Sequence, residues 1–187
     1  YKMQNKDHYL LGCFILKRYG ACIEPICQKL FLLGCVEPDW NLVTYTRGSI
    51  KHRFLHGHNA ENVQKHLTHM TERLMKTGVR TPLQWFYFGA ALHYLADSFT
   101  FAHNRIFTGS IIEHRQYEKV LHTFFTEYLQ AHRDDIFTAE EVCHKRYLLD
   151  RRSYQTDCRY ILGATVMLCS RLDIRWCANK IGERNYA

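Results

Sequence analysis

Apolar side chains in the second half of the chain recur every three or four positions, which is the spacing of one face of an α-helix. One stripe consists of Trp85, Phe88, Ala91, Leu92 and Leu95, and a second consists of Tyr117, Val120, Leu121, Phe124 and Phe125. Both stripes are typical of helices that pack on a core, and no useful alternation predicts a strand. We expect helices at about residues 6–17, 20–33, 59–77, 81–98, 113–132, 139–148 and 153–181.

Start and stop signals support these boundaries. Thr81 offers an N-cap directly before Pro82, and proline suits the first position of a helix. The longest non-helical segment is expected at residues 35–50, which contain Pro38. Asp39 is therefore expected on a loop, which is a common place for a functional side chain.

The length of 187 residues fits one domain, which we take as residues 1–187. A hydrophobic content of 47% excludes an intrinsically disordered chain. The net charge of +7 favours anionic partners, but the basic residues are scattered, as on ordinary solvated helix faces. The sequence predicts no transmembrane segment, because no apolar stretch approaches the length of a membrane span.

The eight cysteines show neither the pairs of a zinc ribbon nor the density of a disulfide-stapled domain. We expect free thiols. Together with the lack of a signal-peptide pattern, they favour the cytoplasm, with secretion as the alternative if an upstream signal has been removed.

Two histidine–carboxylate pairs carry the strongest chemical signal. His93 and Asp97 stand four positions apart, as do His114 and Glu118, and His103 lies between the two pairs. On a helix, this spacing places both side chains on one face, where they can share a metal ion. A surface ion pair explains one such pair equally well, but two on successive helices are much less common by chance.

In this order, His8, Pro38-Asp39, His52, His93-x3-Asp97-x5-His103 and His114-x3-Glu118 resemble the zinc-dependent phospholipases C, which are related to the single-strand nucleases of the P1 type. The resemblance implies an all-α, single-domain helical bundle with a metal cluster between its helices. It also implies a metal-dependent phosphoric ester hydrolase with two to three zinc ions. Phospholipids are among its candidate substrates, which makes peripheral membrane contact an expectation, and nucleic acid is the alternative.

The resemblance also implies a ligand set. Asp39, His52, His93 and Asp97 would hold one zinc ion; His103, His114 and Glu118 would hold a second; Asp97 and His8 would hold a third together with the amino-terminal residue. Family members use a tryptophan at that terminus, where this sequence has Tyr1. Asp39 is the candidate general base. Trp40 could contact a quaternary ammonium group, but Ser49 replaces an aromatic residue of the choline-specific lipases.

Three alternatives remain open from the sequence. The chain could be a single-strand nuclease, a metal-binding relative without activity, or a plain helical interaction domain. The seven remaining histidines are interpreted as surface, core or supporting residues: His56, His58, His66, His69, His122, His132 and His144.

Overall fold

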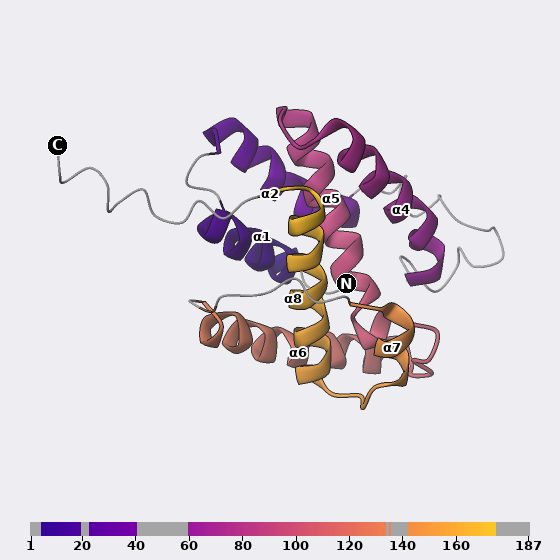
Figure 1. Cartoon of the computed structure of the whole chain (residues 1–187). Helices are drawn as coiled ribbons and strands as arrows, with labels where there is room; N and C mark the ends of the chain where they lie inside the picture. Colours follow the sequence, from indigo (N-terminus) through magenta and orange to yellow (C-terminus); the bar gives the residue numbers. More distant parts are fainter. Residues whose placement is uncertain (1–4, 20–22, 41–59, 134, 136–141, 175–187) are drawn as a thin grey trace.

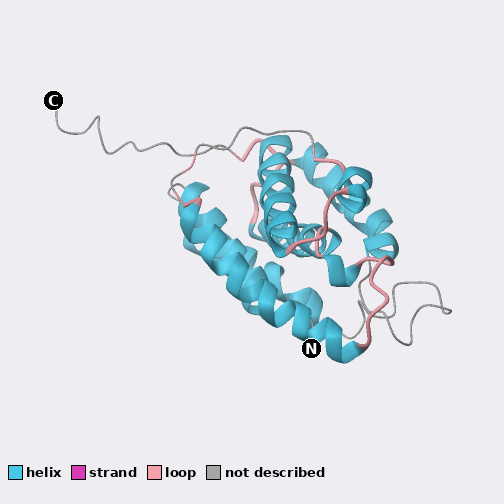
Figure 2. Ribbon diagram, turned by 90° about the horizontal axis from the view of Figure 1, so that it is seen from below, coloured by secondary structure: helices cyan, strands magenta, loops and turns pink. Residues whose placement is uncertain are grey.

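The computed structural model describes residues 5–19, 23–40, 60–133, 135 and 142–174, and every regular element in these ranges is a helix (Figure 2). The elements are α1 (Asn5–Tyr19), α2 (Pro25–Trp40), α4 (Ala60–Thr77), α5 (Pro82–Ser98), the 3-10 helix η3 (Phe101–His103), α6 (Ile111–Ala131), α7 (His144–Leu149) and α8 (Tyr154–Arg171). The expected all-α class is thereby confirmed. None of these helices combines the length and the apolar character that crossing a lipid bilayer requires.

Helix α5 is the central element of the bundle. It packs against α1, α2, α4 and α8, and Figure 1 shows it passing between them. Ten of its 17 residues are buried, which explains why its sequence is apolar on more than one face. The predicted N-cap is confirmed: Thr81 accepts a hydrogen bond from the amide of Gln84, whose side chain completes a capping box. Polar side chains on α5 are therefore carried into the interior.

The crossing of α2 and α5 is unusually close because a glycine lies on each helix. A Cβ atom added to Gly89 would lie 2.1 Å from the carbonyl oxygen of Phe31, and one added to Gly34 would lie 2.1 Å from that of Phe86. No side chain fits between the two backbones at these points. This close approach brings the C-terminal end of α2 beside the middle of α5.

The expected loop at residues 35–50 is wrong in its first part. Helix α2 continues to Trp40 with Pro38 inside it, so Asp39 stands in the last helical turn rather than on a loop. Proline there removes the backbone hydrogen bond to Gly34. Burial of α2 against α5 offsets this single lost bond. Residues 41–50 lie outside the described ranges.

The expected helix at 153–181 is too long. Helix α8 ends at Arg171, because Asp173 adopts a left-handed backbone conformation with φ of 53°. The amide of Ile174 then donates to the carbonyl of Cys169 at 2.9 Å, which closes the helix end. Residues 175–181 are not among those described. Helix α7 is also shorter than expected, since it begins at His144.

The second apolar stripe is only partly a core face. Leu121 and Phe125 of α6 are fully buried, whereas Val120 and Phe124 are 40% and 38% exposed. The buried face of α6 follows the line from Glu118 through Leu121 and Phe125, and the other two side chains lie beside it. A carboxylate thus occupies a position that the pattern alone would assign to the core.

Candidate metal centre

Helix α5 buries two polar side chains, His93 and Asp97, one turn apart on one face. Nδ1 of His93 lies 2.9 Å from the backbone carbonyl oxygen of Cys35 on α2. Because a carbonyl oxygen only accepts hydrogen bonds, Nδ1 carries a proton. This contact aims Nε2 at Asp97, whose Oδ2 is 3.4 Å away. Backbone support of this kind is typical of histidines that bind metals.

The carboxylate of Asp97 lies at the centre of the cluster, among three imidazoles. Its Oδ1 is 3.3 Å from Nε2 of His8, and its Oδ2 is 3.8 Å from Nδ1 of His103, in addition to the contact with His93. Both oxygens are buried, yet neither accepts a hydrogen bond from any residue that the structure describes. The same holds for both ring nitrogens of His8. Such atoms are costly in a folded protein unless a cation neutralises and coordinates them.

Two groups of side chains have the composition and spacing of metal sites. The first contains His8 from α1, Asp39 from α2 and His93 from α5; the second contains His103 from η3 with His114 and Glu118 from α6. Within each group, one possible ligand atom from each residue lies within 4.8 Å of the others. Asp97 contacts both groups and therefore joins them.

The distances within these groups lie near the spacing of ligand atoms around a zinc ion. Ligand atoms about 2.0–2.2 Å from a tetrahedral zinc ion lie about 3.3–3.6 Å from one another. Nε2 of His93 is 3.7 Å from Oδ1 of Asp39, and Nδ1 of His114 is 3.6 Å from Oε1 of Glu118. The pair of His103 Nε2 and Glu118 Oε1 is closer, at 3.1 Å, and forms a hydrogen bond. Imidazole nitrogens and carboxylate oxygens are the donors that zinc accepts.

The pKa values of Asp97, His8 and His93 are shifted by burial and by their mutual charges. Burial by itself raises the pKa of Asp97, but the charges of His103, His93 and His8 outweigh it and hold this pKa well below its ordinary value. Burial, together with His93 stacked at a ring-centroid distance of 3.7 Å, lowers the pKa of His8. Burial also lowers the pKa of His93, but Asp97 and Asp39 reverse the shift, so that this pKa is raised. An ionised Asp97 and a neutral His8 are the forms that bind metal, whereas the raised pKa of His93 favours its protonated form, which must release a proton on binding.

In the second group, burial lowers the pKa of His114 to about 4, and the charge of His103 adds to the effect. His114 is therefore neutral at neutral pH, with a lone pair available for a metal. Burial raises the pKa of Glu118, and the contact with His103 opposes that shift.

Sequence reasoning missed a buried carboxylate that supports the second group. Asp157 of α8 accepts hydrogen bonds from the hydroxyls of Tyr117 at 2.9 Å and Tyr147 at 2.8 Å, and from the amide of Phe101 at 2.9 Å. Phe101 begins η3, which carries His103. No sequence signal marked Asp157, because an acid in the first turn of a helix is normally a solvated residue that complements the helix dipole.

Two further contacts hold the ligand-bearing segments. Nε2 of His144 lies 2.9 Å from the carbonyl of Ser98 and 2.9 Å from Oδ1 of Asn104, on either side of η3. Buried Asp7 contacts Nδ1 of His122 on α6, which fixes α1 next to His8. His144 and His122 thus contact the ligand-bearing segments from outside the two groups.

Some expected site residues lie outside the described ranges. They are His52 and Ser49, together with the side chain of Trp40. Of the eight expected ligands, the structure brings seven together: His8, Asp39, His93, Asp97, His103, His114 and Glu118. Their role as ligands stays a prediction. The described cysteines have free thiols, as expected.

Comparison with known proteins assigns a family. The sequence model of the zinc-dependent phospholipase C family matches residues 17–164, which include six of these seven residues, and His8 lies before the match. None of the curated proteins and none of the solved structures matches the chain. Since the match covers most of the 187 residues, the chain belongs to the zinc-dependent phospholipase C family.

Proposed function

We propose that this chain is a metal-dependent phosphoric ester hydrolase of the phospholipase C type, with a cluster of two to three zinc ions. The observation that carries the proposal is the buried carboxylate of Asp97, which lies between two groups of ligand-type side chains and has no hydrogen bond within the described chain. A surface ion pair would leave such oxygens in water. Family membership supports the same metal and a phosphate-ester or lipid substrate.

The residues take distinct roles in this proposal. When bound, zinc supplies polarisation of the phosphoryl group and a water of lowered pKa. Asp39, whose side chain is almost fully buried beside His93, is the candidate general base that orients this water and accepts its proton. His93 is held by the Cys35 carbonyl in the orientation that a ligand requires. Buried walls around Asp97 exclude bulk water and strengthen each of these interactions.

Metal content of the purified full-length protein is the first test, measured by elemental analysis. We expect about two to three zinc ions per chain, from the number of ligand groups. Absence of stoichiometric zinc after purification without chelator, with none taken up on reconstitution, would refute the proposal.

Substrate class is tested next with the zinc-loaded protein. Phosphatidylcholine vesicles, bis(p-nitrophenyl) phosphate and single-stranded DNA distinguish a lipase, a general phosphodiesterase and a nuclease. We expect release of phosphorylated headgroup from the vesicles, faster than DNA cleavage. Faster cleavage of DNA would favour the nuclease alternative, and a zinc-replete protein inert on all three would favour a metal-binding relative without activity.

A further inference from the structure

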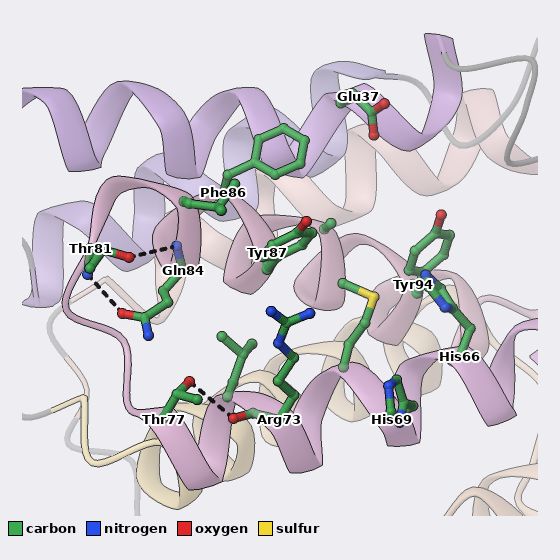
Figure 3. A pocket seen from close by; sticks show the side chains of 14 residues that line it. Glu37, His66, His69, Arg73, Thr77, Thr81, Gln84, Phe86, Tyr87 and Tyr94 are labelled. Carbon is green, nitrogen blue, oxygen red and sulfur yellow. Dashed lines mark hydrogen bonds between the residues drawn. The ribbon is translucent and has the colours of Figure 1, made fainter.

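The ligand-bearing helices are held together in two different ways. Helix α5 begins at the capping box of Thr81 and Gln84, seen in Figure 3, and its backbone crosses that of α2 closely. Helices α1 and α6 are joined instead through polar side chains that are not candidate ligands. This junction matters for the metal centre, because His8 stands on α1 while His114 and Glu118 stand on α6.

The first contact between α1 and α6 lies next to the metal centre. Asp7 has no exposed surface, and its Oδ1 contacts Nδ1 of His122. An ionised carboxylate only accepts hydrogen bonds, so the imidazole donates from Nδ1. His122 follows Glu118 by four positions and continues the ligand face of α6 by one turn. Since Asp7 directly precedes His8, the contact ties a ligand of the first group to the helix face that carries the second.

The second contact lies further along both helices, at the C-terminal end of α6. Arg18 of α1 is only 8% exposed. Its Nη1 donates to the carbonyl of His132 at 3.2 Å and to that of Arg133 at 3.3 Å, and its Nη2 donates to the carbonyl of Asp135. Carbonyls at the end of a helix have no partner within the helix, and a cation there is favourable.

The two contacts have closely matched spacing. Asp7 and Arg18 are 11 positions apart, and His122 is 10 and 11 positions from the two carbonyls at His132 and Arg133. Eleven residues make about three helical turns, or about 16 Å, so Asp7 and Arg18 share one face of α1. Helices α1 and α6 therefore run parallel, with their register fixed at two points. A slip of α1 by one residue would turn its side chains by about 100°.

We propose that Asp7, His122 and Arg18 are positioning residues, which form a two-point clamp that holds His8 against Asp97. The inference rests on the proposed function, since it concerns the metal that His8 would bind. Nε2 of His8 lies 3.3 Å from Oδ1 of Asp97. A ligand tolerates little displacement, because zinc–ligand distances are confined to about 2.0–2.2 Å. Through the clamp, a ligand of the first group depends on the helix that carries the second.

The test loads the full-length protein with cadmium-113 in place of zinc and records an NMR resonance for each bound ion. Glu118→Gln assigns the signals, because the signal that it abolishes belongs to the second group. His122→Phe keeps a ring but removes the donor. We expect it to shift or broaden the first-group signal and to weaken metal binding there by about tenfold or more, with the second signal unchanged.

The outcomes separate the clamp from the proposed function. A wild-type protein that binds no metal would overturn the proposed function itself. A wild-type protein with signals from both groups, together with an unchanged first-group signal in His122→Phe, would overturn only the clamp. Equal loss of both groups in His122→Phe would show general destabilisation and would also overturn the clamp.

Two matched variants sharpen this comparison. His122→Asn restores an N–H donor near the position of Nδ1 and should recover most of the first-group affinity. His132→Phe should leave both signals unchanged: its side chain is about as exposed as that of His122, 30% against 31%, and its Nδ1 contacts the carbonyl of Tyr128 instead of Asp7. Circular dichroism of the metal-free variants checks their helices. If His122→Phe does not fold, His122→Ala gives the same comparison without added bulk.

Arg18→Met tests the second point of the clamp. It keeps the apolar stem but removes the donors to the end of α6, so the first-group signal should broaden and its metal affinity should fall. Lys17→Met is the control, because it removes one positive charge from the neighbouring, exposed position of α1. A first-group affinity equal to wild type in Arg18→Met would overturn the two-point clamp.

Discussion

The hydroxyl of Tyr117 donates a 2.9 Å hydrogen bond to Oδ2 of Asp157, and this contact joins α6 to α8 directly beside Glu118. The same oxygen accepts the amide of Phe101, the first residue of the short helix that carries His103. A single carboxylate outside the metal centre therefore holds two segments that supply the second ligand group. The hydroxyl of Tyr147 donates a hydrogen bond to Oδ1 of Asp157, so the carboxylate is held through both of its oxygens.

Asp157→Asn should weaken zinc binding at the second group by about tenfold, as is usual when support behind metal ligands is lost. The amide has only one acceptor oxygen for three donors, so η3 or Tyr117 must shift. Zinc affinity is measured by competition with a chromophoric chelator. Asp150→Asn is the control, because that carboxylate lies near the surface and pairs with Arg159 at 2.6 Å, away from the ligands. Equal zinc affinity in wild type and Asp157→Asn would contradict the supporting role.

Asp157 should also make stability depend on pH. Burial, opposed in part by its three hydrogen-bond donors, raises its pKa from the ordinary 3.8 to about 6. Because this pKa is raised, the protonated form of Asp157 favours the folded state. Its contribution to the unfolding free energy is therefore complete below about pH 3.8 and is lost as the pH rises through about 6. The unfolding free energy of wild type relative to Asp157→Asn should fall by about 3 kcal/mol over that window. Urea unfolding of both chelator-treated proteins measures it, and a difference independent of pH would contradict the assignment.

The helices could be predicted because their signals are local. Apolar spacing and the Thr81 cap depend on neighbouring residues; the cap is confirmed, and the core faces are confirmed for the stripe on α5 and in part for the stripe on α6. The C-terminal end of α2 could not be predicted, because Pro38 lies inside the helix. Packing of α2 against α5, more than forty positions later in the sequence, compensates for the hydrogen bond that proline removes. The exposure of Val120 was missed for a similar reason: the buried face of α6 is selected by Glu118 and the elements around it.

The candidate ligands could be predicted because histidine and carboxylate spacing records which side chains share a helix face. The groups that hold these ligands in place could not be predicted. The Cys35 carbonyl that orients His93 is a backbone group, which any residue type supplies. Asp157 pairs with Tyr117 and Tyr147, and the latter pairing is set by the placement of α7. Only tertiary structure brings these partners together.

The position of Asp97 predicts unequal effects of two isosteric changes. Asp97 contacts His8, His93 and His103, whereas Glu118 contacts only the second ligand group among the described residues. Asp97→Asn should therefore reduce zinc at both groups, while Glu118→Gln should remove about one ion and leave the first group loaded. Elemental analysis of the two purified variants, each checked for helicity, gives the comparison. Equal zinc content in both variants would show that Asp97 does not join the groups.

The close crossing of α2 and α5 predicts that Gly89→Ala lowers stability and zinc affinity together. The new methyl would lie 2.1 Å from the Phe31 carbonyl oxygen, so the helices must separate, at a cost of about 3 kcal/mol. Separation moves Asp39 away from His93, which weakens the first ligand group. Gly163→Ala is the control, because its methyl would meet only a side-chain atom of Val142, at 3.1 Å. There the gain in helix propensity, about 1 kcal/mol, offsets the displacement, and zinc affinity should not change. Urea unfolding and chelator competition on both variants test this, and a stable Gly89→Ala protein with full zinc affinity would show that the crossing does not position the site.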